Sequence, residues 1–121
     1  MRFRVAWVDT DAGGRIHFTA AFRWAEAAET ALCRSLGMID GWADHPRRAV
    51  EAHYLSVLRF DEEIELELVP ERVGRTSITY GWEIRRDAEV CIRGRHTVVR
   101  VDGDGQPAPL APELRRALSG D

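Results

Sequence analysis

Polar and apolar residues alternate most regularly over residues 63–69, where glutamates separate Ile, Leu and Val side chains. A period of two predicts a β-strand with one wet face and one buried face, and Pro70 is expected to end it. Similar alternation, or an enrichment in β-favouring residues, predicts four further strands at 2–8, 48–58, 76–85 and 89–101. Turn chemistry separates the late strands at 74–75 and 86–88, and the Asp-Gly-Asp-Gly run at 102–105 ends the last one.

Between residues 20 and 36 the apolar positions recur every three or four residues, which predicts an amphipathic helix. The apolar face is small-sided and consists of Ala21, Ala25, Ala28, Leu32 and Leu36. We expect these alanines to let the helix lie close against a sheet. Thr19 is the expected N-cap, and Gly37 is placed to follow the last turn. A short polar helix is expected at 112–118.

The element order is one strand, one long helix and then four strands. Consecutive strands joined by tight turns are expected to be antiparallel neighbours, which predicts an α+β fold. A chain of 121 residues is long enough for one core, and neither an internal repeat nor a linker divides it. We therefore expect a single domain over residues 1–121.

Composition narrows the functional classes. The net charge of −3 argues against a nucleic-acid-binding protein, which usually has a basic face. Cys33 and Cys91 form neither a metal motif nor a disulfide framework, and a reducing compartment is the simplest interpretation. No apolar run approaches the roughly 20 residues that span a bilayer. Together with the lack of an apolar signal segment, this predicts a cytoplasmic protein with no membrane partner.

Most of the reactive chemistry lies within residues 9–24, Asp-Thr-Asp-Ala-Gly-Gly-Arg-Ile-His-Phe-Thr-Ala-Ala-Phe-Arg-Trp. Two carboxylates, a glycine pair and a histidine precede a helix N-terminus, where backbone N–H groups lack intrahelical acceptors. Taken alone, Asp9 and Asp11 fit loop carboxylates that bond to nearby backbone N–H groups. The Gly13-Gly14 pair lacks the context of a phosphate-binding loop and is interpreted as turn geometry.

The run DTDAGGRIHFTAAFRWAEAAE resembles the N-terminal signature of hotdog-fold thioesterases of the 4-hydroxybenzoyl-CoA thioesterase type. The later runs RFDEEIELELVPERVGRTSITYGWEIRR and VDGDGQPAPLAPELRRAL resemble that family too, so the likeness covers nearly the whole chain. The resemblance implies one long helix wrapped by a curved antiparallel sheet. It also implies a homodimer or homotetramer with sites at subunit interfaces, and a reaction that needs no metal or organic cofactor.

The resemblance also implies roles for individual residues. Asp11 matches the catalytic carboxylate, acting as nucleophile or as the base that activates water, and the Phe18 N–H matches the oxyanion donor. His17 is an auxiliary catalytic candidate. The expected substrate-binding residues are Gly14, Thr19 and Trp24. Asp9 is expected to fix the loop, and Ala20-Ala21 replaces the Asn-Tyr of many relatives, which bears on acyl preference.

The function that follows is hydrolysis of an acyl-CoA or acyl-carrier-protein thioester. One alternative is a non-catalytic acyl-CoA-binding or sensing module, and another is an off-loading thioesterase specific for a carrier protein. A hotdog dehydratase is disfavoured, because nothing in the chain resembles the signature of that group.

Other residues have a structural and a functional interpretation. Glu26 and Glu29 fit solvated helix acids, although a helix acid is the catalyst in a sister group of thioesterases. His53 is interpreted as a residue that packs in the core or at an interface, and no role is assigned to His45 or His96. Five arginines fit solvated strand faces or contacts to a CoA phosphate or an acidic carrier protein: Arg75, Arg85, Arg86, Arg93 and Arg95.

Overall fold

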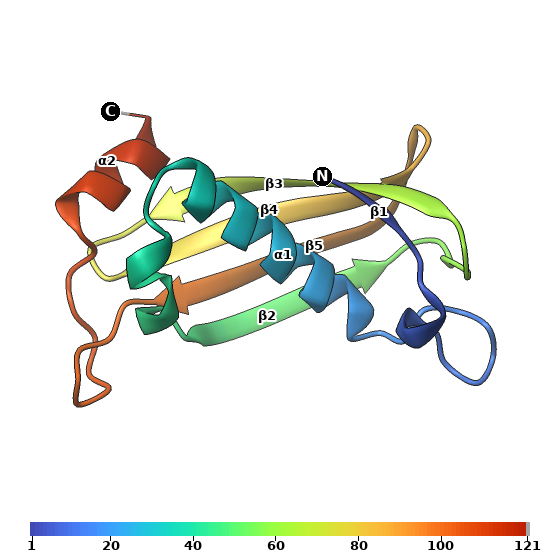
Figure 1. Cartoon of the computed structure of the whole chain (residues 1–121), viewed down its shortest axis with the longest axis horizontal. Helices are drawn as coiled ribbons and strands as arrows, with labels where there is room; N and C mark the ends of the chain where they lie inside the picture. Colours follow the sequence, from blue (N-terminus) through green and yellow to red (C-terminus); the bar gives the residue numbers. More distant parts are fainter. Residues whose placement is uncertain (121) are drawn as a thin grey trace.

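The computed structural model describes residues 1–120 and contains one five-stranded sheet. The strands lie in the order β1-β3-β4-β5-β2, and every neighbouring pair is antiparallel. The long helix α1 crosses one face of this sheet (Figure 1). This arrangement confirms the predicted α+β hotdog fold. In chain order the elements are β1 (Arg2–Arg4), the 3-10 helix η1 (Trp7–Asp9), α1 (Ala20–Ser35), the 3-10 helix η2 (Ile39–Asp44), β2 (Arg47–Tyr54), β3 (Glu63–Val73), β4 (Ser77–Arg86), β5 (Glu89–Val99) and α2 (Pro112–Ser119).

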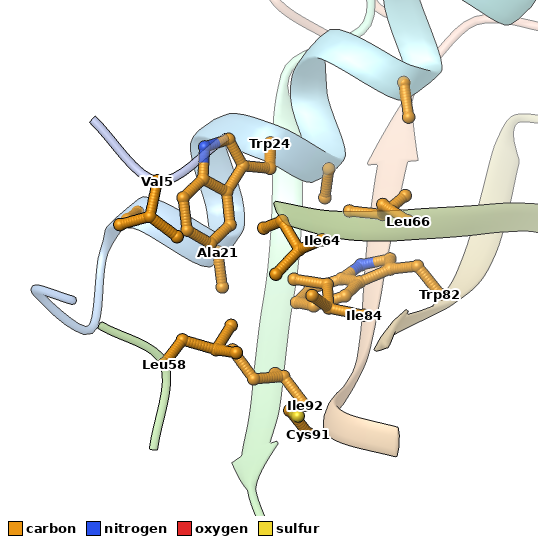
Figure 2. Close-up of a cluster of buried hydrophobic side chains, with 13 residues drawn as sticks. Val5, Ala21, Trp24, Leu58, Ile64, Leu66, Trp82, Ile84, Cys91 and Ile92 are labelled. Carbon is orange, nitrogen blue, oxygen red and sulfur yellow. The ribbon is translucent and has the colours of Figure 1, made fainter. Parts of the chain in front are cut away.

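The main core lies between α1 and the sheet. Ala20, Ala21 and Ala25 are at most 1% exposed, so the small face of the helix lies against the sheet as predicted. Figure 2 shows how larger side chains fill the space around these alanines, including Val5, Leu58, Ile64, Leu66 and Ile84. Burial of each large aliphatic side chain contributes about 1.5–3 kcal/mol, so this layer is the main source of stability.

A glycine makes room for the largest side chain of the sheet. Gly94 on β5 is paired with Trp82 on β4, and a Cβ atom at Gly94 would lie 2.2 Å from the Trp82 ring. Only glycine therefore lets the Trp82 indole lie across β5 beneath α1. The indole N–H is thereby placed to reach another β5 side chain, His96.

The predicted strand at 2–8 is wrong beyond Arg4. Residues 7–9 form η1 instead, because the Asp9 side chain accepts the Ala6 N–H and the Asp9 N–H returns to the Ala6 carbonyl. The predicted end of a strand at Pro70 is also wrong, since β3 continues to Val73. β1 covers only Glu63–Glu65 of β3, and the register shifts just after Pro70, so this proline lies where one edge of β3 is uncovered, beside a bulge.

Two other boundaries follow from hydrogen bonds. β2 ends at Tyr54 rather than at residue 58, because the next two N–H groups, those of Leu55 and Ser56, both donate to the Cys91 carbonyl and the chain leaves the ladder. α1 stops as predicted at Gly37, whose φ of 71° is left-handed. Met38 N–H then donates to the Cys33 carbonyl and closes the helix. No helix within residues 1–120 is long and apolar enough to cross a membrane.

Candidate active site

Asp9 fixes the loop that leads into α1. Its side chain is buried, with Oδ2 accepting the Ala6 N–H at 2.9 Å and Oδ1 paired with Arg23 at 2.9 Å. Its carbonyl accepts the His17 N–H at 2.7 Å. These contacts tie both ends of the loop to each other and to α1, which is the structural role expected of Asp9.

Asp11 lies at the tip of the same loop and is exposed. Its Oδ1 accepts the Gly13 N–H at 2.8 Å and the Arg15 N–H at 3.4 Å, a local turn of the kind aspartate favours. Gly14 completes this turn with a φ of 79° and donates to the Asp11 carbonyl. Among residues 1–120, Oδ2 has no hydrogen-bond partner. The turn therefore holds the carboxylate by one oxygen and leaves the other open.

Asp11 lines an open groove of about 460 Å³. One wall consists of Asp11 and residues 15–18, and the other consists of residues 54–58, which follow β2. The Ile16 N–H donates to the Leu58 carbonyl at 3.0 Å and joins the two walls. Leu55 and Val57 are 56% and 46% exposed, so the second wall offers apolar surface to a ligand.

Phe18 is the residue at which the loop enters α1. Its N–H has no acceptor within the part of the chain that the structure describes, whereas the neighbouring N–H groups of His17 and Thr19 are both bonded. Its carbonyl accepts a hydrogen bond from the Tyr54 hydroxyl across the groove. Partial burial raises the pKa of the Tyr54 hydroxyl. The Phe18 backbone is thus anchored by its carbonyl and offers a donor by its N–H.

His17 and Thr19 form a pair at the same turn. The Thr19 hydroxyl lies 2.7 Å from His17 Nδ1, and the Thr19 N–H, which can only donate, is 3.3 Å from the same atom. Nδ1 is therefore the acceptor nitrogen, and the neutral ring carries its hydrogen on Nε2. Thr19 occupies the predicted N-cap position, but its side chain makes no cap bond because it contacts His17 instead. The His17 ring also stacks on the Phe18 ring, with centroids 4.7 Å apart.

The structure brings Asp11, His17 and Phe18 together on one groove. Gly14 and Thr19 do not line the groove, and they act on the turn and on His17 respectively. Trp24 is not brought to the groove either. It is 5% exposed and packs in the core, with its ring 6.1 Å from that of Phe3 (Figure 2 shows the indole beside Val5). We therefore assign Trp24 to the core, because it lies on the sheet-facing side of α1.

The interpretation of Glu29 as a solvated helix acid is wrong. Glu29 is 1% exposed, and its carboxylate accepts three hydrogen bonds, from Trp42 Nε1 at 2.8 Å, Arg47 at 3.0 Å and His96 Nε2 at 2.6 Å. A carboxylate that accepts from three donors and is almost fully buried cannot serve as an alternative nucleophile. Glu26, one turn earlier, is exposed as predicted.

His96, for which no role was predicted from the sequence, links α1 to the sheet. The Trp82 indole N–H can only donate, so His96 Nδ1 accepts from it at 3.1 Å. His96 Nε2 therefore carries the hydrogen and donates it to Glu29. Burial, together with the nearby Glu29 carboxylate, raises the pKa of the Cys33 thiol to about 11. This network is a structural feature of the core rather than a second reactive site.

Sequence reasoning missed the second wall of the groove. Residues 54–58 carry no local motif, and the Tyr54 contact joins positions 36 residues apart. Four of the five arginines that fitted either a solvated strand face or a phosphate contact are paired with glutamates, namely Arg85, Arg86, Arg93 and Arg95. Within residues 1–120, no group of three or more His, Cys, Asp or Glu side chains is placed to hold a metal.

Comparisons with known proteins agree with this fold. The family model of the thioesterase superfamily matches residues 13–92, a range that includes every residue of the groove except Asp11. No curated protein sequence matches the chain.

Solved structures match over almost the whole chain. BH1999 gentisyl-coenzyme A thioesterase has a TM-score of 0.89 at 18% identity, over 98% of each chain. Slr0204, a 1,4-dihydroxy-2-naphthoyl-CoA thioesterase from Synechocystis, has a TM-score of 0.88 at 16% identity, over 98% of this chain and 93% of the other. The dynemicin thioesterase has a TM-score of 0.86 at 23% identity, over 99% and 94%. At such identities these neighbours establish the fold, and the family match, which spans more than half of the chain, establishes that this protein belongs to the thioesterase superfamily and is a thioester hydrolase.

Proposed function

We propose that the protein hydrolyses its acyl thioester in the groove beside α1, with Asp11 as the catalytic carboxylate and the Phe18 N–H as the oxyanion donor. One observation carries this proposal: Asp11 and Phe18 line the same groove, and within residues 1–120 one carboxylate oxygen of Asp11 and the backbone N–H of Phe18 have no hydrogen-bond partner. Hydrolysis of a thioester develops negative charge on the carbonyl oxygen. A fixed amide donor stabilises that charge without reorganisation, and removal of such a donor typically costs about 3 kcal/mol of barrier.

Two routes use these groups. In the first, Asp11 accepts a proton from water as the water oxygen attacks the carbonyl carbon, the C–S bond then breaks, and the proton passes to the thiolate. In the second, Asp11 attacks the carbon directly, expels the thiolate and forms an anhydride that water cleaves. A single turnover in ¹⁸O-labelled water distinguishes them, because only the second route can place the label on the Asp11 carboxylate.

His17 is proposed to assist. Its Nε2–H is the ring donor left over after Nδ1 accepts from Thr19, and it can orient water or the thioester. Gly14 and Thr19 act indirectly, by shaping the Asp11 turn and by holding the His17 ring. Ala20 and Ala21 are 0% exposed, so the positions at which many relatives carry Asn-Tyr contribute packing here.

The proposed substrate is an acyl group on CoA or on an acyl carrier protein. Two structural neighbours are named for aromatic acyl-CoA esters, and the third, the dynemicin thioesterase, is described with polyene binding. A first screen therefore pairs aromatic and long polyunsaturated acyl groups with each thiol. A protein that binds these esters and releases no thiol would be the acyl-binding module instead. A protein that ignores CoA esters and cleaves carrier esters would be an off-loading thioesterase.

We further propose a homo-oligomer in the cytoplasm. β2 is an edge strand, and Val50, Tyr54, Leu55 and Val57 on and after it are 45–56% exposed. An open strand edge with apolar side chains is a natural place for a second copy, which would then cover the groove. The two cysteines are free and buried, as expected in a reducing compartment. Light scattering on the purified protein tests the oligomer.

The decisive experiment replaces Asp11 with asparagine and measures thiol release from the best ester of the screen. We expect Asp11→Asn to lower kcat at least about a hundredfold, the usual size of an acid–base contribution, with an unchanged circular dichroism spectrum. Asp40→Asn is the matched control, because Asp40 is an exposed acid on η2, outside the groove. Near-normal turnover by Asp11→Asn would refute the assignment.

A further inference from the structure

Two arginines face each other at one end of the groove. Arg15 and Arg59 are partners in an isolated antiparallel bridge between the Asp11 loop and the segment that follows the second wall. Side chains of directly opposed residues project to the same face, with Cα atoms about 5 Å apart. Both residues are exposed. The bridge therefore places the two arginine side chains on the same face, and Arg15 itself lines the groove.

The acids near this pair are engaged elsewhere. Asp61 and Glu63 pair with Arg4, and Glu62 pairs with Arg86. Asp9 is held by Arg23. Neither Arg15 nor Arg59 has an ion-pair partner within residues 1–120, and no Asp11 oxygen lies within 4.0 Å of the Arg15 guanidinium. This end of the groove thus has two cations against one open carboxylate.

Directly opposed like charges are unfavourable in a sheet, so the arrangement is best satisfied by an anion between them. Paired guanidinium groups suit phosphate, because each can donate two parallel N–H bonds to its oxygens. The other end of the groove, where Tyr54 contacts Phe18, offers exposed apolar side chains at Phe18 and Leu55. The groove is therefore polarised, with a cationic end and an apolar end.

We propose that Arg15 and Arg59 bind a phosphate of the thiol half of the substrate, so that the acyl group extends toward the apolar end. This inference rests on the proposed function, since it concerns the same groove. Every CoA ester and every carrier-protein ester contains a phosphate on its pantetheine arm, and the two sources share this chemistry. The pair would then select phosphorylated thiols over plain pantetheine.

Calorimetric binding of free CoA, 4′-phosphopantetheine and pantetheine to the intact protein tests the proposal without any choice of acyl group. We expect the first two to bind and pantetheine to bind at least about tenfold more weakly, as loss of charge-assisted hydrogen bonds implies. The double variant Arg15→Gln/Arg59→Gln should lose this preference. Arg115→Gln, a change at an exposed arginine on α2 that has no ion-pair partner within residues 1–120, should keep it. Higher salt should weaken CoA binding in the wild type and not in the double variant.

These measurements distinguish the pantetheine phosphate from the nucleotide phosphates of CoA. They also distinguish failure of the phosphate site from failure of the proposed function. Equal affinities for CoA and 4′-phosphopantetheine assign the contact to the pantetheine phosphate that carrier proteins share, whereas tighter CoA binding lost in the double variant assigns it to the nucleotide phosphates. If CoA fails to bind at millimolar concentration, or binds equally well to the double variant, the phosphate site is overturned even where thioesters are cleaved. If CoA binds through the two arginines and no thioester is cleaved, the proposed function fails and the site stands.

Discussion

The Glu29 carboxylate accepts three hydrogen bonds in the core, and its replacement by glutamine tests that network. Glutamine keeps the shape of the side chain but turns one acceptor oxygen into an NH₂ group. That group must face a donor from Trp42, Arg47 or His96, since these three supply all of the bonds. Each hydrogen bond to a charged group contributes about 1.5–3 kcal/mol. The Arg47 side chain is 26% exposed and can regain water, which reduces the penalty.

We therefore expect Glu29→Gln to lower the free energy of unfolding by about 3 kcal/mol, an estimate that takes two weakened bonds and discounts the Arg47 contribution. For a chain of this size, that loss corresponds to a fall in Tm of roughly 10 °C. Urea unfolding followed by tryptophan fluorescence measures it, at a fixed protein concentration because an oligomer makes stability concentration-dependent.

Glu26→Gln is the matched control, because Glu26 lies one turn earlier on α1, is exposed, and approaches Arg47 only at 3.9 Å. Its effect should stay within about 0.5 kcal/mol, as for most surface substitutions. Equal stabilities of the two variants would refute the buried network and restore the interpretation of Glu29 as a solvated acid.

Two further predictions concern the groove and the core. Tyr54→Phe removes the hydroxyl that anchors the Phe18 carbonyl. We expect kcat to fall roughly fivefold, the equivalent of one hydrogen bond, with KM unchanged. A changed KM with normal kcat would assign Tyr54 to substrate binding instead. The pKa of Cys33 is raised from 9.0 to about 11, so its thiol stays protonated near neutral pH and native protein should react slowly with a disulfide reagent until guanidinium unfolds it. Because the folded state holds this proton more tightly than the unfolded state, its contribution to stability is present below pH 9.0 and is lost as pH rises toward about 11. Denaturation at a series of alkaline pH values measures that loss. Rapid labelling of Cys33 in the native protein would contradict a buried thiol with a raised pKa.

The sequence by itself determined those features that depend on local pattern. The alternation at 63–69 and the small face of the helix placed β3 and α1, because periodicity reports directly which side is buried. Gly37 marked the end of the helix, since a left-handed residue is needed there. The resemblance carried by residues 9–24 predicted the fold and directed attention to the loop that holds Asp11, His17 and Phe18.

Only the tertiary structure decided what depends on partners distant in sequence. A helix acid looks solvated from its neighbours, and Glu29 is buried because η2, β2 and β5 each bring a donor to it. The second wall of the groove and the opposition of Arg15 to Arg59 arise from pairing across more than 35 residues, which no local pattern records. Proline could remain within β3 because β1 is short and leaves that edge open. Burial and proximity are properties of the packed chain, so these features followed from the fold rather than from any one segment.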